Sequence, residues 1–150
     1  MASGVTVQDS CIQKINEMKR GKNPLTALIM KLSDDNREIV VDQECGLDKT
    51  LEDIKRDYLK NDTPAYILYD SYHRQKVDSM AKRKLQLIVW CPDTCKVKQK
   101  MLIASSKDAL KKKIEGVAEK DWQWCDDESA MENIKEQMDL KNQCGDQLQE

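Results

Sequence analysis

The chain of 150 residues contains few of the residues from which active sites and phosphate-binding loops are built. It has five glycines and a single histidine, His73, which lies in the polar stretch HRQK and is predicted to be a surface residue. The motifs of serine hydrolases, zinc peptidases, P-loop proteins and dinucleotide-binding proteins are absent. GKNP at residues 21–24 lacks the run of glycines that cradles a phosphate. We therefore predict a binding protein without catalytic residues or a cofactor.

Long apolar runs and paired metal ligands are also absent. No run approaches the roughly 20 apolar residues of a membrane-spanning helix, and MASGVTVQDS has no apolar core of a secretory signal. The sequence therefore predicts a cytoplasmic protein whose six cysteines are free thiols. Only Cys91 and Cys95 lie close together in the sequence, whereas a zinc site needs two such pairs or several histidines. We expect no metal site.

Charge is distributed unevenly, although the net charge is only −2. Residues 119–150 carry ten acids and three lysines, and we expect an acidic, flexible tail from about residue 141 to residue 150. Between Lys96 and Lys113 lie seven lysines and one acid, Asp108. A chain near neutrality is not typical of proteins that bind nucleic acid in bulk. The concentrated positive segment therefore predicts an acidic protein partner and no nucleic acid.

The lysine-rich segment has the periodicity of a helix that is capped by Asp93 or Thr94. At about 100° per residue, one stripe is apolar and predicted to be buried, comprising Ile103, Leu110, Ile114 and Val117. Val97 and Met101 fall roughly opposite this stripe, beside small residues. An exposed methionine on a flat face suits the hydrophobic cleft of a partner, and flanking lysines would steer its approach. A solvated lysine face with an incidentally exposed methionine is the alternative on pattern alone.

The remaining sequence alternates between helical and extended patterns. Helical patterns cover residues 8–20, 50–60 and 128–140, and Thr50 with Asp53 forms a predicted capping box. Extended patterns cover residues 25–33, 37–44, 64–74, 84–92 and 122–125. Hairpins interleaved with helices predict one domain over residues 1–150, with a mixed, largely antiparallel sheet covered on both faces. The short N-terminus, residues 1–6, is expected to be flexible.

Four segments resemble the actin-depolymerising factor/cofilin family: MASGV, YILYDSYH, VWCPD and KVKQKMLIASSKDALKKKIEG. The last segment is similar, almost residue for residue, to the family's long actin-binding helix. The chain is identified as a member of this family over about residues 1–140. The resemblance implies an α+β fold with a five-stranded mixed, mostly antiparallel sheet sandwiched by four or five helices.

The resemblance also implies a function and its residues. A family member binds actin monomers and filament sides, prefers the ADP state and promotes depolymerisation and severing. The implied monomer-binding residues are Ser3, Gly4, Val5, Val97, Lys98, Lys100, Met101, Lys107, Asp108, Lys111 and Lys112. The implied filament-binding residues are Lys82, Lys84, Glu132 and Lys135. Ser3 occupies the regulatory phosphorylation position, and a phosphoinositide membrane surface is expected to compete for Lys98, Lys100, Lys111, Lys112 and Lys113.

Some residues depart from the family pattern and leave alternatives open. Asn133 and Glu136 stand where relatives often have arginine, which allows a monomer-sequestering variant with weak filament binding. LTALIMKLSDDNREIVVDQE also resembles the glia-maturation-factor branch, whose debranching proteins lack the lysines found here. A third alternative is an enzyme or nucleic-acid protein that uses the basic helix on phosphates. Ile103 replaces a common tyrosine, an apolar change that we expect to be tolerated.

The resemblance places the expected protein in the cytoplasm, at the actin cytoskeleton, as a monomer. Vertebrate members carry a basic nuclear-import run near residue 30, where this chain has NPLTALIMK. Nuclear entry through that signal is therefore not implied.

Overall fold

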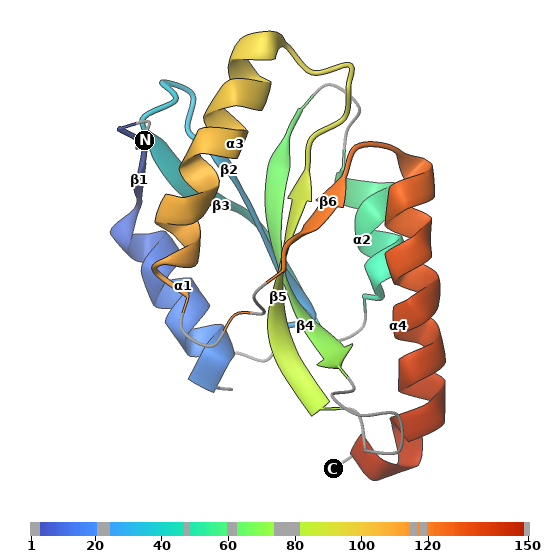
Figure 1. Ribbon diagram of the computed structural model, residues 1–150. Coiled ribbons are helices and arrows are strands. Elements are labelled where there is room, and N and C mark those ends of the chain that lie inside the picture. Colours follow the sequence, from blue (N-terminus) through green and yellow to red (C-terminus); the bar gives the residue numbers. More distant parts are fainter. Residues whose placement is uncertain are drawn as a thin grey trace.

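A computed structural model describes residues 4–20, 25–46, 49–59, 63–73, 82–114, 117 and 120–148 of the chain. In these ranges the chain forms six strands and four helices (Figure 1). In chain order they are β1 (Thr6–Val7), α1 (Asp9–Arg20), β2 (Ala27–Leu32), β3 (Glu38–Cys45), α2 (Leu51–Tyr58), β4 (Ala65–His73), β5 (Lys82–Trp90), α3 (Val97–Lys111), β6 (Trp122–Trp124) and α4 (Asp127–Leu148).

The strands form one mixed sheet in the order β1-β3-β2-β4-β5-β6. The four long strands pair antiparallel, whereas β1 and β6 pair in parallel with β3 and β5. The predicted α+β class and the mostly antiparallel sheet are confirmed, with six strands where five were expected. The additional strand is β1, in which Thr6 and Val7 pair with Glu38 and Ile39. It lies partly in the N-terminal segment that was expected to be flexible.

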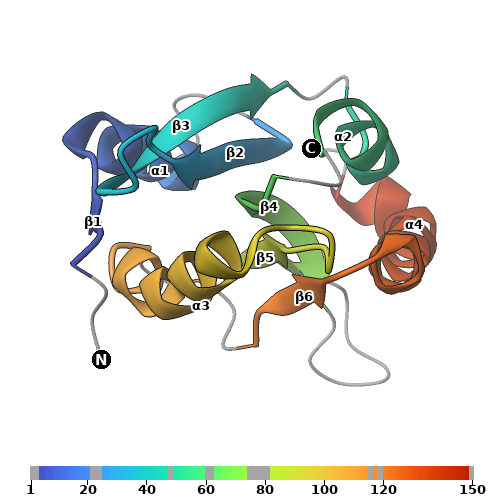
Figure 2. The ribbon, with the colours of Figure 1, turned by 90° about the horizontal axis from the view of Figure 1, so that it is seen from above.

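Helices cover both faces of the sheet, as predicted (Figure 2). Leu28 and Met30 of β2 point toward α1 and α3, while the alternate residues Ala27 and Ile29 point toward α2 and α4. These side chains are fully buried because successive residues of a strand face opposite sides of the sheet. The continuous apolar pattern of β2 is therefore the pattern of a strand buried on both faces.

Local hydrogen bonds fix the hairpin that joins β2 to β3. The Ser33 hydroxyl donates to Asp35 Oδ1 over 2.6 Å, and the Ser33 amide donates to the Glu38 carbonyl. Asn36 adopts a left-handed conformation with φ 60°, which asparagine tolerates better than most residues. The extended patterns at residues 25–33 and 37–44 therefore form one of the predicted hairpins, joined by a polar turn.

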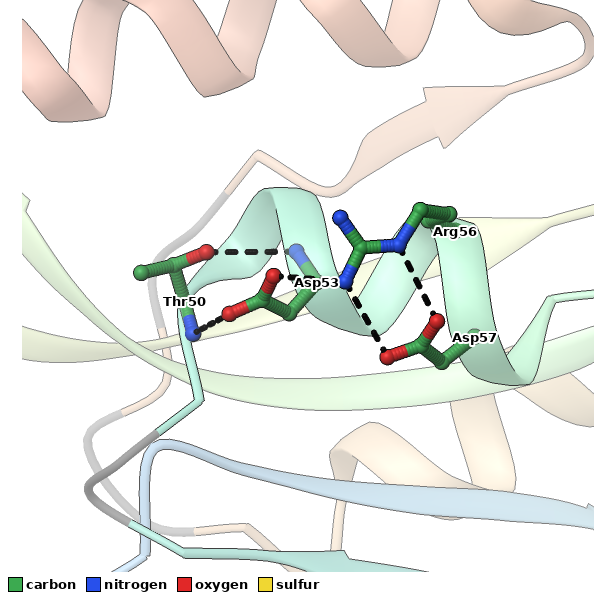
Figure 3. Close-up of polar contacts among 4 residues, drawn as sticks. All are labelled: Thr50, Asp53, Arg56 and Asp57. Atoms are coloured by element: carbon green, nitrogen blue, oxygen red, sulfur yellow. Dashed lines mark hydrogen bonds and ion pairs between the residues drawn. The ribbon is translucent and has the colours of Figure 1, made fainter.

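The capping box predicted for α2 is also present (Figure 3). The Asp53 amide donates to the Thr50 hydroxyl over 3.2 Å, and the Thr50 amide donates to Asp53 Oδ2 over 3.1 Å. The Thr50 backbone N–H, followed by the hydroxyl, lowers the pKa of the Asp53 carboxyl. Arg56 pairs with both Asp53 and Asp57 on this exposed helix face.

The C-terminal helix α4 extends beyond its predicted end at residue 140 and continues to Leu148. Most of the segment that was expected to be a flexible tail is therefore helical. In the ranges that the structure describes, no helix is both long and apolar enough for a membrane span.

Candidate functional site

Helix α3 is held against the sheet by one buried stripe. Ile103, Ser106 and Leu110 are buried, and Ile114 just beyond the helix packs in the same cluster, as the periodicity predicted. The Tyr66 hydroxyl of β4 donates a hydrogen bond to the backbone carbonyl of Ile103. Burial raises the pKa of Tyr66, so the hydroxyl keeps the proton that it donates. A central strand therefore anchors the backbone of α3.

The outer face of α3 exposes two apolar side chains. Val97 is 71% exposed and Met101 is 67% exposed, and they lie one helical turn apart. Among the described residues, Met138 of α4 is the only other large apolar residue that is exposed. The predicted outward orientation of Val97 and Met101 is confirmed.

The lysines of α3 and of the two residues that follow it fall into two groups. Lys98, Lys112 and Lys113 are exposed, as is Asp108, while Lys100 is half-buried. Lys107 and Lys111 instead reach Asp121, which immediately precedes β6, and each ammonium nitrogen lies 3.0 Å from a different carboxylate oxygen. Periodicity places Lys107 and Lys111 on one stripe, but nothing in the sequence links that stripe to Asp121. In the sequence, Asp121 is one of the ten acids of residues 119–150, and no pattern distinguishes it from the others.

The N-terminus of α3 differs from the prediction. Its N-cap is Lys96, which makes no side-chain capping bond, and no acid lies in its first turn. The expected cap at Asp93 or Thr94 was wrong because a turn, closed by the Cys95 amide and the Pro92 carbonyl, intervenes before the helix. The partial positive charge of a helix N-terminus therefore adds to that of the nearby lysines.

The N-terminal segment runs beside α3 (Figures 1 and 2). Val5 is buried in the cluster that also holds Ile103 and Leu110. Gly4 has φ 82°, a left-handed conformation that glycine adopts without a steric penalty. Val5 thus packs in the same cluster as the buried stripe of α3, while Ser3 falls outside the described residues.

The residues implied for filament binding lie on other elements. Lys82 and Lys84 occupy the start of β5, paired with His73 and Ser71 of β4, and their side chains are outside the described part of the chain. Glu132 and Lys135 are exposed on α4, on the opposite face of the sheet from α3 (Figure 2).

Asn133 is half-buried and faces the sheet from α4. Its side-chain oxygen accepts a hydrogen bond of 2.8 Å from the indole Nε1 of Trp124, a buried residue of β6. Glu136 is exposed. The exposed acids on the same helix as Lys135 include Glu128, Glu132 and Glu136.

The sequence profile described as "Cofilin/tropomyosin-type actin-binding protein" matches residues 4–139. Actophorin of Acanthamoeba castellanii is 36% identical over 115 residues, covering 77% of this chain and 80% of the relative. Cofilin of Yarrowia lipolytica is 37% identical over 116 residues, covering 77% and 74%.

Solved structures agree with the sequence relatives. The crystal structure of Plasmodium berghei actin depolymerization factor 2 superimposes with a TM-score of 0.75 at 30% identity, covering 93% of this chain and 99% of that chain. Streptomyces griseoflavus cofilin gives a TM-score of 0.73 at 32% identity, covering 89% and 96%. The chain therefore belongs to the cofilin/tropomyosin-type family of actin-binding proteins.

Proposed function

We propose that this protein binds actin monomers and filament sides through α3 and promotes filament disassembly. The observation that carries the proposal is the pair of exposed apolar side chains, Val97 and Met101, on a helix rich in lysine. Full burial of a side chain of this size stabilises a complex by about 1.5–3 kcal/mol. Lysines on both sides of the pair, among them Lys98 and Lys112, would pair with carboxylates of actin and orient the helix.

Disassembly would require a second contact with the neighbouring subunit of the filament. The start of β5, with Lys82 and Lys84, and α4, with Glu132 and Lys135, supply the candidate surface. Because α3 and α4 lie on opposite faces of the sheet, one molecule can present both surfaces at once. If these surfaces fit a twisted filament better than the relaxed one, binding shifts the filament toward the twisted form and weakens its subunit contacts.

Monomer sequestration with weak filament binding is the second candidate function. The observation that favours it is the charge of the exposed residues of α4, where Lys135 shares the helix with the exposed acids Glu128, Glu132 and Glu136. Asn133 adds no charge there because its amide is neutral, and its side-chain oxygen accepts a hydrogen bond from Trp124. Monomer and filament affinities measured side by side separate the two functions.

Two anionic groups are proposed to regulate the same helix. Ser3 lies two residues before Val5, which is buried in the cluster beneath α3, so the Cα atoms of Ser3 and Val5 are at most about 7 Å apart. A phosphate adds a charge of about −1.5 to −2 and would compete with actin for lysines. Phosphoinositides would compete for Lys98, Lys100, Lys111, Lys112 and Lys113 in the same way. If Ser3→Asp binds monomers as tightly as the wild type, the phosphorylation proposal fails.

A pair of methionine variants tests the actin-binding surface. Met101→Ala should weaken binding to actin monomers about tenfold, because it removes apolar surface that the complex buries. Met138→Ala is the matched control, since this methionine is also exposed on a helix but lies on the other face. Equal monomer affinities for the two variants would rule out docking through Met101.

A further inference from the structure

We infer that Asp121 is a positioning residue of the actin-binding surface. Its carboxylate holds the ammonium groups of Lys107 and Lys111 in fixed places before the partner arrives. This inference rests on the proposed function, because it states how two residues of that surface are prepared for an acidic partner. In this inference Asp121 acts only through the two lysines and does not itself contact actin.

The geometry is that of one carboxylate shared by two ammonium groups. Lys107 Nζ lies 3.0 Å from Asp121 Oδ2, and Lys111 Nζ lies 3.0 Å from Oδ1. Oδ1 has no aligned hydrogen-bond donor in the described part of the chain, so the Lys111 contact is one of charge rather than of hydrogen-bond direction. Each lysine therefore has its own oxygen, and neither displaces the other.

Burial distinguishes this cluster from an ordinary surface ion pair. The Asp121 side chain is 8% exposed, and those of Lys107 and Lys111 are 29% and 23% exposed. A pair that is largely withdrawn from water is less screened than an exposed pair. By contrast, the side chains of the Lys14–Glu44 pair are each 38% exposed. The Asp121 cluster is thus the more strongly held of the two.

The spacing of the lysines explains why a carboxylate is needed. Residues four apart share one face of a helix, where two like charges repel each other. Asp121 reduces the net charge of the three groups from +2 to +1 and keeps both ammonium groups on that face. An ammonium group has three N–H donors, so Lys107 retains donors for a carboxylate of the partner.

Fixing a lysine before binding avoids the loss of side-chain freedom on binding. Lys98, Lys112 and Lys113 form no ion pair with another residue of the described ranges, so each would be ordered only in the complex. The surface therefore combines two positioned lysines with a set of exposed ones. The positioned pair should determine orientation, while the exposed lysines contribute mainly to long-range attraction.

Asp121→Asn tests the inference, because it preserves shape and removes the charge. Positioning predicts binding to actin monomers about tenfold weaker than wild type, although the variant has one more net positive charge. If Asp121 merely competes with actin for the lysines, the variant binds more tightly, and that result overturns the inference. Glu128→Gln makes the same charge change on α4 and should leave monomer binding unchanged.

A double-mutant cycle separates positioning from a structural role. In a Lys107→Gln/Lys111→Gln background, Asp121→Asn should cause no further loss of monomer affinity, because nothing remains to be positioned. A further loss in that background would mean that Asp121 supports the fold alone, and would overturn the inference. Wild-type protein that fails to bind actin would refute the proposed function. Wild-type binding with an unaffected Asp121→Asn variant would refute the positioning role only.

A measurement on the wild type does not depend on the variants folding. Lysine ammonium groups held in an ion pair exchange their protons more slowly and are more ordered than solvated ones. Nitrogen-15 NMR of the unbound protein should detect ordered ammonium signals for Lys107 and Lys111, but not for Lys98. Signals for Lys107 and Lys111 as averaged as that of Lys98 would overturn the inference.

Discussion

Helices α3 and α4 lie on opposite faces of one sheet, and they differ in how they begin and in which side chains they expose. α3 begins at Lys96 without a side-chain cap, carries lysines and exposes Val97 and Met101. α4 begins with a reciprocal cap in which the Ser129 amide donates to Asp126 Oδ1 over 2.8 Å and the Asp126 amide donates to the Ser129 hydroxyl. Most of the exposed charges among its described side chains are acidic. The comparison teaches that the helix with fewer local stabilising contacts at its start is the one that presents an apolar, positively charged surface.

The largest effect is expected from a variant that weakens the packing of α3 on the sheet. Leu110→Ala should lower the free energy of unfolding by about 3 kcal/mol, because it leaves a cavity in a fully buried site. Val97→Ala, on the exposed side of the same helix, should change it by less than about 0.5 kcal/mol. Chemical denaturation measures both values. Similar losses for the two variants would contradict the buried-stripe assignment.

Charge reversal on α3 sharpens the comparison with α4. Lys98→Glu/Lys100→Glu should weaken binding to monomeric actin at least 100-fold, about 2.7 kcal/mol, because it replaces attraction by repulsion. Lys135→Glu on α4 should leave monomer binding near that of the wild type. A double variant that still captures monomers at wild-type affinity would remove α3 from the proposed interface.

The hydrogen bond between Trp124 and Asn133 should matter for stability rather than for monomer binding. Asn133→Ala removes the acceptor of the indole N–H and should lower the free energy of unfolding by about 1–2 kcal/mol. Monomer affinity should not change, since this contact lies on the α4 side. Thermal unfolding and a monomer-binding assay, run on the same sample, test both statements.

The smallest effect concerns the cap of α4 and its dependence on pH. The Ser129 backbone N–H, followed by the hydroxyl, lowers the pKa of Asp126 in the folded protein. The charged cap therefore stabilises α4 above the unfolded pKa of about 3.9, and this stabilisation is lost as pH falls through the lower, folded value. Asp126→Asn does not titrate. The stability difference between wild type and this variant should shrink below about pH 4; a constant difference would contradict the assignment.

Elements with a clear period were predictable from the sequence. The buried stripe of α3, the strands buried on both faces and the Thr50 capping box all have local patterns, and the structure confirms them. β1 escaped prediction because two residues carry no period. The extension of α4 to Leu148 escaped because residues 141–148 are mostly polar, with no apolar stripe to mark a helix.

The candidate site was predictable only in part. Periodicity identified the outward Val97 and Met101, and the family resemblance supplied actin as a partner. The sequence could not identify the role of Asp121, because its contact with Lys107 and Lys111 depends on how the chain returns from α3 to β6. The sequence also could not predict the hydrogen bond between Trp124 and Asn133, since that bond depends on the packing of α4 on the sheet.

The Tyr66 hydroxyl holds a backbone carbonyl of α3 rather than a side chain. A backbone carbonyl is the same whichever amino acid occupies the position, so the anchor does not depend on the identity of residue 103. Side chains on the outer face of α3 can therefore change over evolution while the helix keeps its place on the sheet. The contact that positions the helix is thus independent of the side chains that the helix exposes.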